Sequence, residues 1–192
     1  MKRQLKIAVL FLVIFSVITG ILYPLLVTGV AQAFFHHQAN GSLIENNGTA
    51  MGSELIGQPF SDPKYFWGRL SATTPYPYNA SASAGSNFGP SDTQLKAEIQ
   101  SRIDALKTVD PDNTQPIPVD LVTSSGSGLD PDISVAAAEY QVPRVARVRG
   151  LVQSDVEALV KKNTRGRQFG FLGEPRVNVL SLNLALDNPG GQ

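Results

Sequence analysis

The first 31 residues separate into a short charged tip and a long apolar run. Three basic side chains lie within positions 1–6, and the 25 residues at 7–31 carry no charge. A helix of that length would extend about 37 Å, which exceeds the hydrocarbon core of a bilayer at about 30 Å. Because positive charges beside a span stay in the cytoplasm, the pattern predicts a cytoplasmic tip at 1–6 and a transmembrane helix at 7–31. Residues 32–192 would then form a single extracytoplasmic domain.

A cleaved signal peptide is the alternative interpretation of the same segment. Basic residues precede the apolar run, and Ala31, Gln32 and Ala33 resemble a cleavage site. A signal peptide has an apolar region of about 7–15 residues, so the longer run favours a retained anchor. Both interpretations place the following domain outside the cytoplasm.

The predicted span contains residues that interrupt or thin a helix. Pro24 would remove one helical hydrogen bond, and Gly20 and Gly29 would allow a neighbouring helix to approach closely. Together with Tyr23, these positions are candidates for packing against a partner in the membrane, the alternative being an ordinary proline kink. The span has no ionisable side chain, so it offers no ion path of its own.

Beyond the span, apolar residues recur at helical spacing behind recognisable helix starts. Ser-x-x-Gln and Ser-x-x-Glu patterns, which match the capping box, begin the first and last of these segments. Helices are expected from Ser91 to about 107, from Ser134 to Gln141, from Pro143 onward if that residue begins a helix rather than ending one, and from Ser154 to Asn163.

Strand patterns are fewer and shorter. Strands are expected at 119–123 and 177–186, the second with a bulge where the apolar phase shifts. The segment 71–92 is rich in Ser, Ala, Gly and Pro and predicts a long loop. Two of the three consecutive rings at 65–67 are expected in the core. The predicted domain is therefore α+β, with few strands and about three to four helices.

Composition excludes several functions. The chain has 192 residues, with 16 basic and 16 acidic side chains, no Cys, and two His that lie side by side at His36 and His37. Zero net charge argues against nucleic-acid binding, because such proteins carry surplus positive charge. Without Cys there is no thiolate metal site, disulfide or thiol nucleophile. No metal site or catalytic residue is therefore expected.

Charge is unevenly distributed along the domain. Residues 88–140 hold nine acidic and three basic side chains, whereas 141–176 hold eight basic and three acidic ones. This polarity predicts either ion pairing within the domain or oriented docking on another subunit.

Short motifs along nearly the whole chain resemble the C-subunit family (KdpC) of the Kdp potassium-transporting ATPases. In the membrane the resemblance rests on Tyr23-Pro24-Leu25 and Thr28-Gly29. The family-motif positions outside it are Gln38, Asn40, Gly41, Gly57, Gln58, Asn87, Gly128, Asp130, Arg144, Asn178 and Asn183. The sequence departs from the family pattern at His36 and Leu70, where Pro is expected, and at Asp132, where His is common.

The resemblance implies a non-catalytic, single-pass subunit of a bacterial inner-membrane complex for high-affinity potassium uptake. Its implied partners are a channel-like potassium-binding subunit, a P-type ATPase subunit, a small membrane peptide and the lipid bilayer. The family is described as raising the ATP affinity of the pump subunit, and Gln141 is the nearest candidate for that nucleotide-binding role. No cofactor is expected to bind firmly, and ATP only together with the pump subunit.

Two hypotheses from other classes remain. One is a membrane-anchored periplasmic adaptor or binding protein. The other is an envelope hydrolase, although the chain has no G-x-S-x-G motif and its only His pair lies beside the predicted span.

Overall fold

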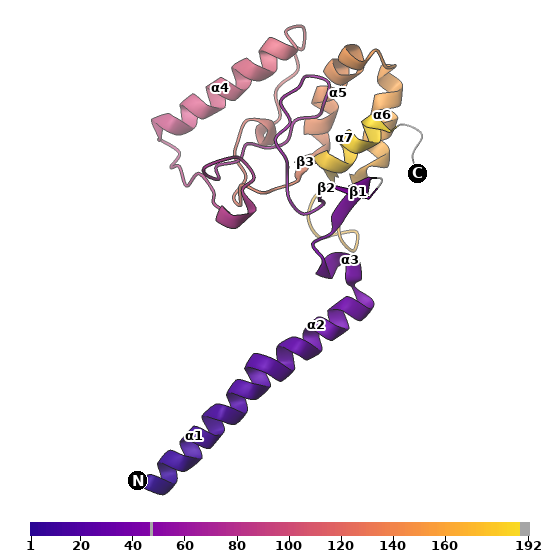
Figure 1. The fold of residues 1–192 in the computed structure, drawn as a ribbon. Helices are drawn as coiled ribbons and strands as arrows, with labels where there is room; N and C mark the ends of the chain where they lie inside the picture. The colour runs from indigo at the N-terminus through magenta and orange to yellow at the C-terminus, as the bar shows by residue number, and fades with distance from the viewer. Residues whose placement is uncertain (47, 189–192) are drawn as a thin grey trace. The chain divides into compact units, whose positions relative to one another are not determined.

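The computed structural model describes residues 1–46 and 48–188. The chain divides into two compact units, Met1–Leu43 and Ile44–Gln192. Figure 1 shows the elements of each unit along the chain.

The first unit is dominated by one long helical stretch. It contains α1 (Lys2–Val17), a π-helical turn (Ile18–Leu22), α2 (Tyr23–Phe34) and the short α3 (His36–Ala39). From Lys2 to Phe34 the 33 residues are apolar enough and long enough to cross a membrane. No residue of α1 or α2 is buried. The apolar surface of this helix therefore needs lipid or another chain to cover it.

The π-helical turn lies where the sequence places its proline. Pro24 has no N–H to donate to the carbonyl of Gly20, so the regular bond pattern cannot pass through this point. The turn Ile18–Leu22 is the wider spacing that absorbs the interruption. The Thr19 hydroxyl also donates to the Phe15 carbonyl at 2.7 Å.

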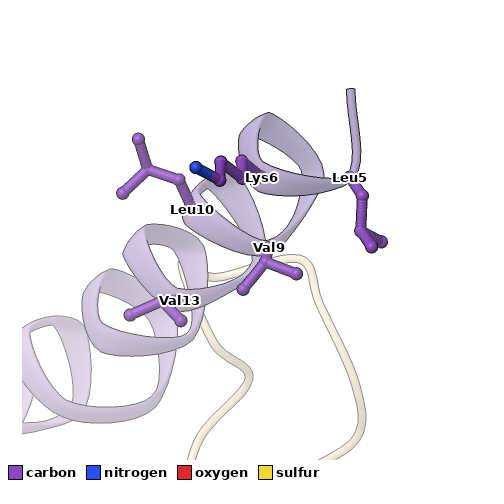
Figure 2. Close-up of a pocket in the computed structure, with 5 residues that line it drawn as sticks. All are labelled: Leu5, Lys6, Val9, Leu10 and Val13. Atoms are coloured by element: carbon purple, nitrogen blue, oxygen red, sulfur yellow. The ribbon is translucent and has the colours of Figure 1, made fainter. Parts of the chain in front are cut away.

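A shallow hollow on α1 is lined mainly by apolar side chains. Figure 2 shows Leu5, Val9, Leu10 and Val13 with the stem of Lys6 on the helix surface. All are exposed within the unit. Lys6 can therefore pack its stem along apolar surface while its ammonium group reaches water.

The second unit contains two small sheets. β1 (Leu43–Asn46) pairs with β2 (Thr49–Ser53), and a three-stranded sheet has the order β3-β5-β4. Its strands are β3 (Asp132–Ser134), β4 (Thr164–Arg165) and β5 (Arg176–Asn178). Both pairings are antiparallel, with Ile133 and Thr164 opposite Val177 on either side.

Helices and aromatic side chains supply most of the core. The helices are α4 (Thr93–Val109), α5 (Val135–Arg149), α6 (Gln153–Lys162) and α7 (Val179–Asp187). Figure 1 shows α5, α6 and α7 gathered together with α4 set apart. Phe66 and Trp67 are buried in the core and Tyr65 is half-buried, which confirms the prediction for two of the three rings. Small sheets and four α-helices in the described part of this unit confirm the α+β class.

The strand predicted at 177–186 is wrong beyond its first two residues. β5 ends at Asn178, and α7 begins at the next residue. The Asn178 side chain accepts a hydrogen bond from the backbone N–H of Ser181 at 3.0 Å, which is a helix N-cap. The apolar phase shift therefore marks a change from strand to helix, not a bulge.

Two other expectations also need correction. Residues 119–121 form a 3₁₀ turn, not a strand, directly after Pro118. Pro143 neither ends nor begins a helix, because α5 runs through it from Val135 to Arg149. The cap of α5 is as predicted, since Ser134 Oγ accepts from the N–H of Ala137 at 3.0 Å.

The two capping boxes are wrong in detail. Asp92, not Ser91, caps α4, with its carboxylate accepting from the N–H of Gln94 at 2.8 Å. Helix α6 begins at Gln153, behind Val152, which makes no side-chain cap bond. The long loop at 71–92 is confirmed, with one short 3₁₀ turn at Ala80–Ala82.

Candidate functional site

Gln141, the residue predicted to take part in nucleotide binding, lies in the core. Its side chain bonds both backbone groups of one residue in the aromatic segment 65–67, an arrangement that we call the clamp. Its side chain is 1% exposed. The carboxamide oxygen accepts from the N–H of Trp67 at 2.8 Å, and the amide nitrogen donates to the carbonyl of Trp67 at 3.1 Å. The nitrogen also donates to the carbonyl of Ala137 at 3.1 Å, one turn earlier in α5. The carboxamide thus makes the two hydrogen bonds to the backbone of Trp67 that a neighbouring β-strand would make.

Asn183, on α7, makes the same clamp on the preceding residue. Its oxygen accepts from the N–H of Phe66 at 2.9 Å, and its nitrogen donates to the carbonyl of Phe66 at 3.0 Å. Two helices therefore hold consecutive residues of one extended segment through buried carboxamides. These bonds satisfy backbone groups that no sheet reaches, which is why a polar side chain is tolerated at each position.

Arg144 completes the clamp from α5. Its guanidinium donates to the carbonyl of Pro63, to the carbonyl of Tyr65 at 3.0 Å and to the oxygen of Gln141 at 2.7 Å. It also lies over the Trp67 ring at 5.1 Å from the centroid. Burial lowers the pKa of Arg144 to about 10. Even so, the group stays charged at neutral pH, and its donors are matched to carbonyl oxygens.

The clamp leaves no hydrogen-bonding group of Gln141 facing solvent. A nucleotide could reach the carboxamide only if Trp67 and Arg144 moved aside. The nucleotide role of Gln141 therefore stays a prediction, and its position in the structure is that of a packing residue.

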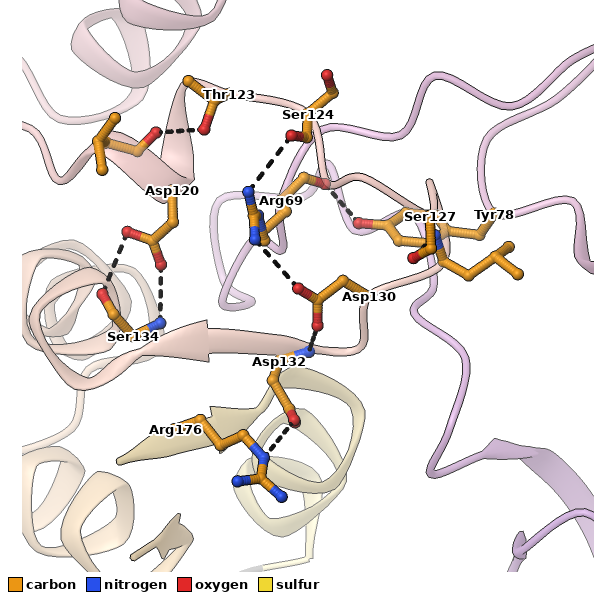
Figure 3. A network of polar contacts seen from close by, with 12 residues as sticks. Arg69, Tyr78, Asp120, Thr123, Ser124, Ser127, Asp130, Asp132, Ser134 and Arg176 are labelled. Atoms are coloured by element: carbon orange, nitrogen blue, oxygen red, sulfur yellow. Dashed lines mark hydrogen bonds and ion pairs between the residues drawn. The ribbon is translucent and has the colours of Figure 1, made fainter. Parts of the chain in front are cut away.

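A second polar network lines a groove beside β3 and β5, with a volume of about 700 Å³. Figure 3 shows its charged centre: Arg69 donates to Asp130 at 3.2 Å, and Arg176 pairs with Asp132 at 2.8 Å. The carboxylate of Asp130 also accepts from the N–H of Asp132 at 3.0 Å. Two buried polar atoms here, Nε of Arg69 and one carboxylate oxygen of Asp132, have no hydrogen-bond partner.

Asp120 anchors the other wall of this groove. Its carboxylate accepts from both the N–H and the hydroxyl of Ser134, at 2.7 and 3.1 Å. Within residues 1–46 and 48–188, no group of three or more His, Asp or Glu is placed to hold a metal ion. Ser134 and Asp120 both line the groove, and the Ser134 hydroxyl is held between this carboxylate and the N–H of Ala137, which it caps.

Several family-motif positions hold loops together. A Cβ on Gly57 would lie 2.3 Å from the Tyr78 ring and 2.7 Å from the carbonyl of Asp130. Gly128 has φ +68°, and a Cβ there would lie 2.6 Å from the carbonyl of Ala84. Both glycines therefore allow loops to approach where no side chain fits.

The polar motif residues act similarly. The Gln58 amide donates to the carbonyl of Met51 at 2.8 Å, and that of Asn178 donates to the carbonyl of Glu54 at 2.9 Å. Asn87 adopts a left-handed backbone at φ +54°, which Asn tolerates better than most residues. The contacts and backbone conformations of these residues shape the domain.

The motif residues after α2 form a compact turn. The Asn40 amide donates to the carbonyl of His36 at 2.8 Å, and Gly41 has φ +85°. His36 Nδ1 lies 3.1 Å from the Gln32 carboxamide oxygen. Gln38 contributes its carbonyl, which accepts from the N–H of Gly41 at 3.1 Å. His36 thus takes part in local bonding at the position where Pro is expected.

Of the other two departures from the family pattern, Leu70 bridges to Ser124 and its carbonyl accepts from the N–H of Ser125 at 3.0 Å. Asp132 is the ion-pair partner of Arg176. Neither contact assigns these positions a functional role.

In the long apolar helix Lys2–Phe34, the four candidate packing residues are open. A Cβ on Gly20 or Gly29 would meet nothing within 4 Å, and Tyr23 is 65% exposed. Gly20 and Gly29 are nine residues apart and therefore lie on opposite sides of the helix, so both sides are open to neighbouring helices.

The uneven charge is partly paired within the domain. Arg147 pairs with Asp110 at 2.7 Å, and Arg176 pairs with Asp132 at 2.8 Å. Each ion pair joins the acidic middle of the chain to its basic last third.

Sequence reasoning missed two arginines that complete the centre of the domain. Arg102 of α4 lies 4.8 Å from the Trp67 ring centroid and donates to the carbonyls of Gly68 and Leu121 at 2.9 and 3.0 Å. Arg69 reaches Asp130 across the groove. The only signal was the position of Arg69 directly behind the aromatic run.

Comparisons with known proteins agree along almost the full length. A family model described as KdpC, K+-transporting ATPase, c chain, matches residues 5–188. The potassium-transporting ATPase KdpC subunit of Methylococcus capsulatus is 64% identical over 187 residues, covering 97% of this chain and 98% of the relative. The KdpC subunits of Herpetosiphon aurantiacus and Paraburkholderia phytofirmans are 60% and 59% identical, each over 97% of both chains.

Proposed function

Because the chain belongs to the KdpC family of K+-transporting ATPase c chains, we propose that it is a non-catalytic subunit that assembles and stabilises the membrane complex for potassium uptake. The observation that carries the proposal is the uncovered helix Lys2–Phe34, whose Gly20 and Gly29 meet no neighbour in this chain. A helix with open small residues suits close packing against another membrane helix.

The partners we propose are the channel-like potassium-binding subunit, the P-type ATPase subunit and the small membrane peptide. A mild-detergent pull-down of the full chain, followed by mass identification, tests them. Gly20→Leu and Gly29→Leu together should reduce recovery of the channel-like subunit, because larger side chains would hold the helices apart. Leu12→Ile is the matched control, since it changes an exposed apolar residue of the same helix without adding volume.

Recovery of the chain as a stable monomer, with no other subunit, would instead favour a free-standing adaptor. Activity of the purified chain alone on envelope substrates would favour a hydrolase. If deletion of the chain left complex assembly and high-affinity potassium uptake unchanged, the proposal would fail.

The proposed orientation places residues 32–192 outside the inner membrane. The basic residues before the apolar run support this orientation, because they are retained in the cytoplasm. The chain has no native Cys, so single cysteines introduced at Gln4 and Asp112 can be labelled separately in right-side-out vesicles. An impermeant thiol reagent should label the Cys at position 112 and not the one at position 4; the reverse result would invert the topology.

An effect on ATP affinity, if present, is proposed to be indirect and to require the pump subunit. The burial of Gln141 supports this view, since its carboxamide is bonded to Trp67 and Arg144. The test is the ATP KM of the assembled complex with and without this subunit. Firm ATP binding to the purified chain alone would contradict an indirect role.

A further inference from the structure

The loop between β4 and β5 carries a concentrated apolar tip on the surface of the second unit. Phe169 is 88% exposed, Phe171 is 70% exposed and Leu172 is 47% exposed. Single exposed apolar residues are common on proteins, but three within four positions at the end of one loop form a patch that water does not favour.

The tip is ordered by its own backbone. The N–H of Gln168 donates to the carbonyl of Leu172 and the N–H of Leu172 donates to the carbonyl of Gln168, both at 2.9 Å. Phe169 and Gly170 both have positive φ, at 52° and 81°. Positive φ at two consecutive central residues is the geometry of a tight hairpin turn. A Phe in this backbone conformation is uncommon, and residues held in such conformations cluster at functional positions.

Charges lie at the base of the loop and not at its tip. Residues 168–173 carry no charge. Arg165 pairs with Glu54 at 2.8 Å, and Arg167 pairs with Glu174 at 2.6 Å. An uncharged aromatic tip beside two ion-paired arginines is a composition found where proteins meet the boundary between lipid headgroups and acyl chains.

The base of the loop is also tied to the part of the domain that follows the membrane helix. β1 begins at Leu43, nine residues after α2 ends at Phe34. That segment can extend at most about 30 Å, a tether short enough for the second unit to reach the surface of a bilayer that α2 would cross. β2 pairs with β1, and Glu54, the residue directly after β2, is the ion-pair partner of Arg165.

We propose that the tip Phe169–Leu172 inserts into the outer surface of the lipid bilayer and acts as a second, peripheral membrane contact of the domain. The phenyl rings would lie at the boundary of headgroups and acyl chains, while the paired arginines remain at headgroup level. This contact goes beyond the proposed assembly role, because its partner is lipid and not a subunit.

The experiment uses the full chain in nanodiscs, both alone and within the co-purified complex. Gln168→Cys places a thiol beside the tip and leaves Phe169 and Phe171 unchanged. The thiol is unique because the chain has no other Cys. An environment-sensitive fluorophore on this thiol should emit as in an apolar medium. Its fluorescence should lose about half or more of its intensity when ordinary lipids are replaced by lipids that carry a quencher near the headgroup. The reason is that interfacial groups lie about 5–10 Å into that region.

Two controls define the result. Asp112→Cys, an exposed position in the turn after α4, should show emission as in water and no lipid quenching. In Gln168→Cys combined with Phe169→Asn and Phe171→Ser, lipid quenching should fall to the level of Asp112→Cys. Asn tolerates the left-handed backbone at position 169, and unchanged Trp67 fluorescence would show that the domain is still folded.

Water-like emission at position 168 without lipid quenching would overturn the proposal. Apolar emission that lipid quenchers do not reach would overturn it as well, because the tip would then be buried against protein. Recovery of the partner subunits, measured on the same samples, tests the assembly role separately.

Discussion

Replacing Gln141 by Leu should destabilise the domain by about 3 kcal/mol. The change removes the bonds to the N–H and carbonyl of Trp67 and one acceptor of Arg144, while leaving the site filled. Each buried backbone group left without a partner costs about 1–3 kcal/mol, so the two groups of Trp67 give about 2–6 kcal/mol before the gain from burying an apolar side chain. With total stabilities of about 5–15 kcal/mol, this is a large fraction.

Urea unfolding of the full chain in detergent, followed by fluorescence, measures the loss. Trp67 is the only Trp in the chain, and it is the residue that Gln141 clamps. At a slope of about 2 kcal/mol per molar urea, the midpoint should fall by about 1.5 M. Glu139→Leu changes an exposed residue of the same helix and should stay within about 0.5 kcal/mol of the parent.

Gln141→Glu separates structure from nucleotide binding. The carboxylate keeps an acceptor for the N–H of Trp67 and for Arg144 but cannot donate to the carbonyl of Trp67. The loss in free energy of unfolding should therefore lie between those of Glu139→Leu and Gln141→Leu. If Gln141→Leu unfolded at the same urea concentration as Glu139→Leu, the reasoning from the clamp would be refuted. If folded Gln141→Glu complex had a raised ATP KM, the residue would have a role beyond packing.

Three further predictions concern the same domain. Gly128→Ala should cost about 2–4 kcal/mol in urea unfolding, because a Cβ would meet a carbonyl at 2.6 Å on a left-handed backbone, whereas Gly126→Ala, with nothing within 4 Å, should cost less than about 1 kcal/mol. Burial raises the pKa of Tyr78 in the folded chain above its ordinary value of 10. The unfolded chain therefore loses this proton at lower pH, and the free energy of unfolding falls as the pH rises beyond 10. In Tyr78→Phe the urea midpoint should fall less between pH 8 and pH 11 than in the parent chain, and an equal fall would contradict this. Asn178→Ala should lower the free energy of unfolding by about 1–2 kcal/mol through loss of the cap on α7, and a matching loss of helical circular dichroism would confirm its cause.

Local patterns predicted the parts of the fold that depend on local physics. The apolar run at 7–31 predicts the long helix that the structure shows at Lys2–Phe34, and Ser134 is a cap because its hydroxyl bonds three residues ahead. By contrast, the Leu-rich segment at 179–186 suits either a strand or a helix. Its choice depends on the cap at Asn178 and on packing that a local pattern does not contain.

The clamp was beyond prediction for a related reason. Gln141 and Asn183 bond to residues 74 and 117 positions earlier, and no spacing rule connects them. The family motifs did identify Asn183 and Arg144 as notable, but their contacts with the aromatic segment explain why. Gly128 is similar: the sequence places it in a family motif but does not predict its positive φ.

The clamp on Phe66 has a consequence for the timing of synthesis. Because Asn183 is made 117 residues after Phe66, the aromatic segment waits roughly 6–23 s for its second clamp at ordinary rates of about 5–20 residues per second. Until then its backbone groups and rings lack their native contacts. The domain can therefore reach its native form only after Asn183 has been made, and any surface that depends on the clamped aromatic segment forms no earlier.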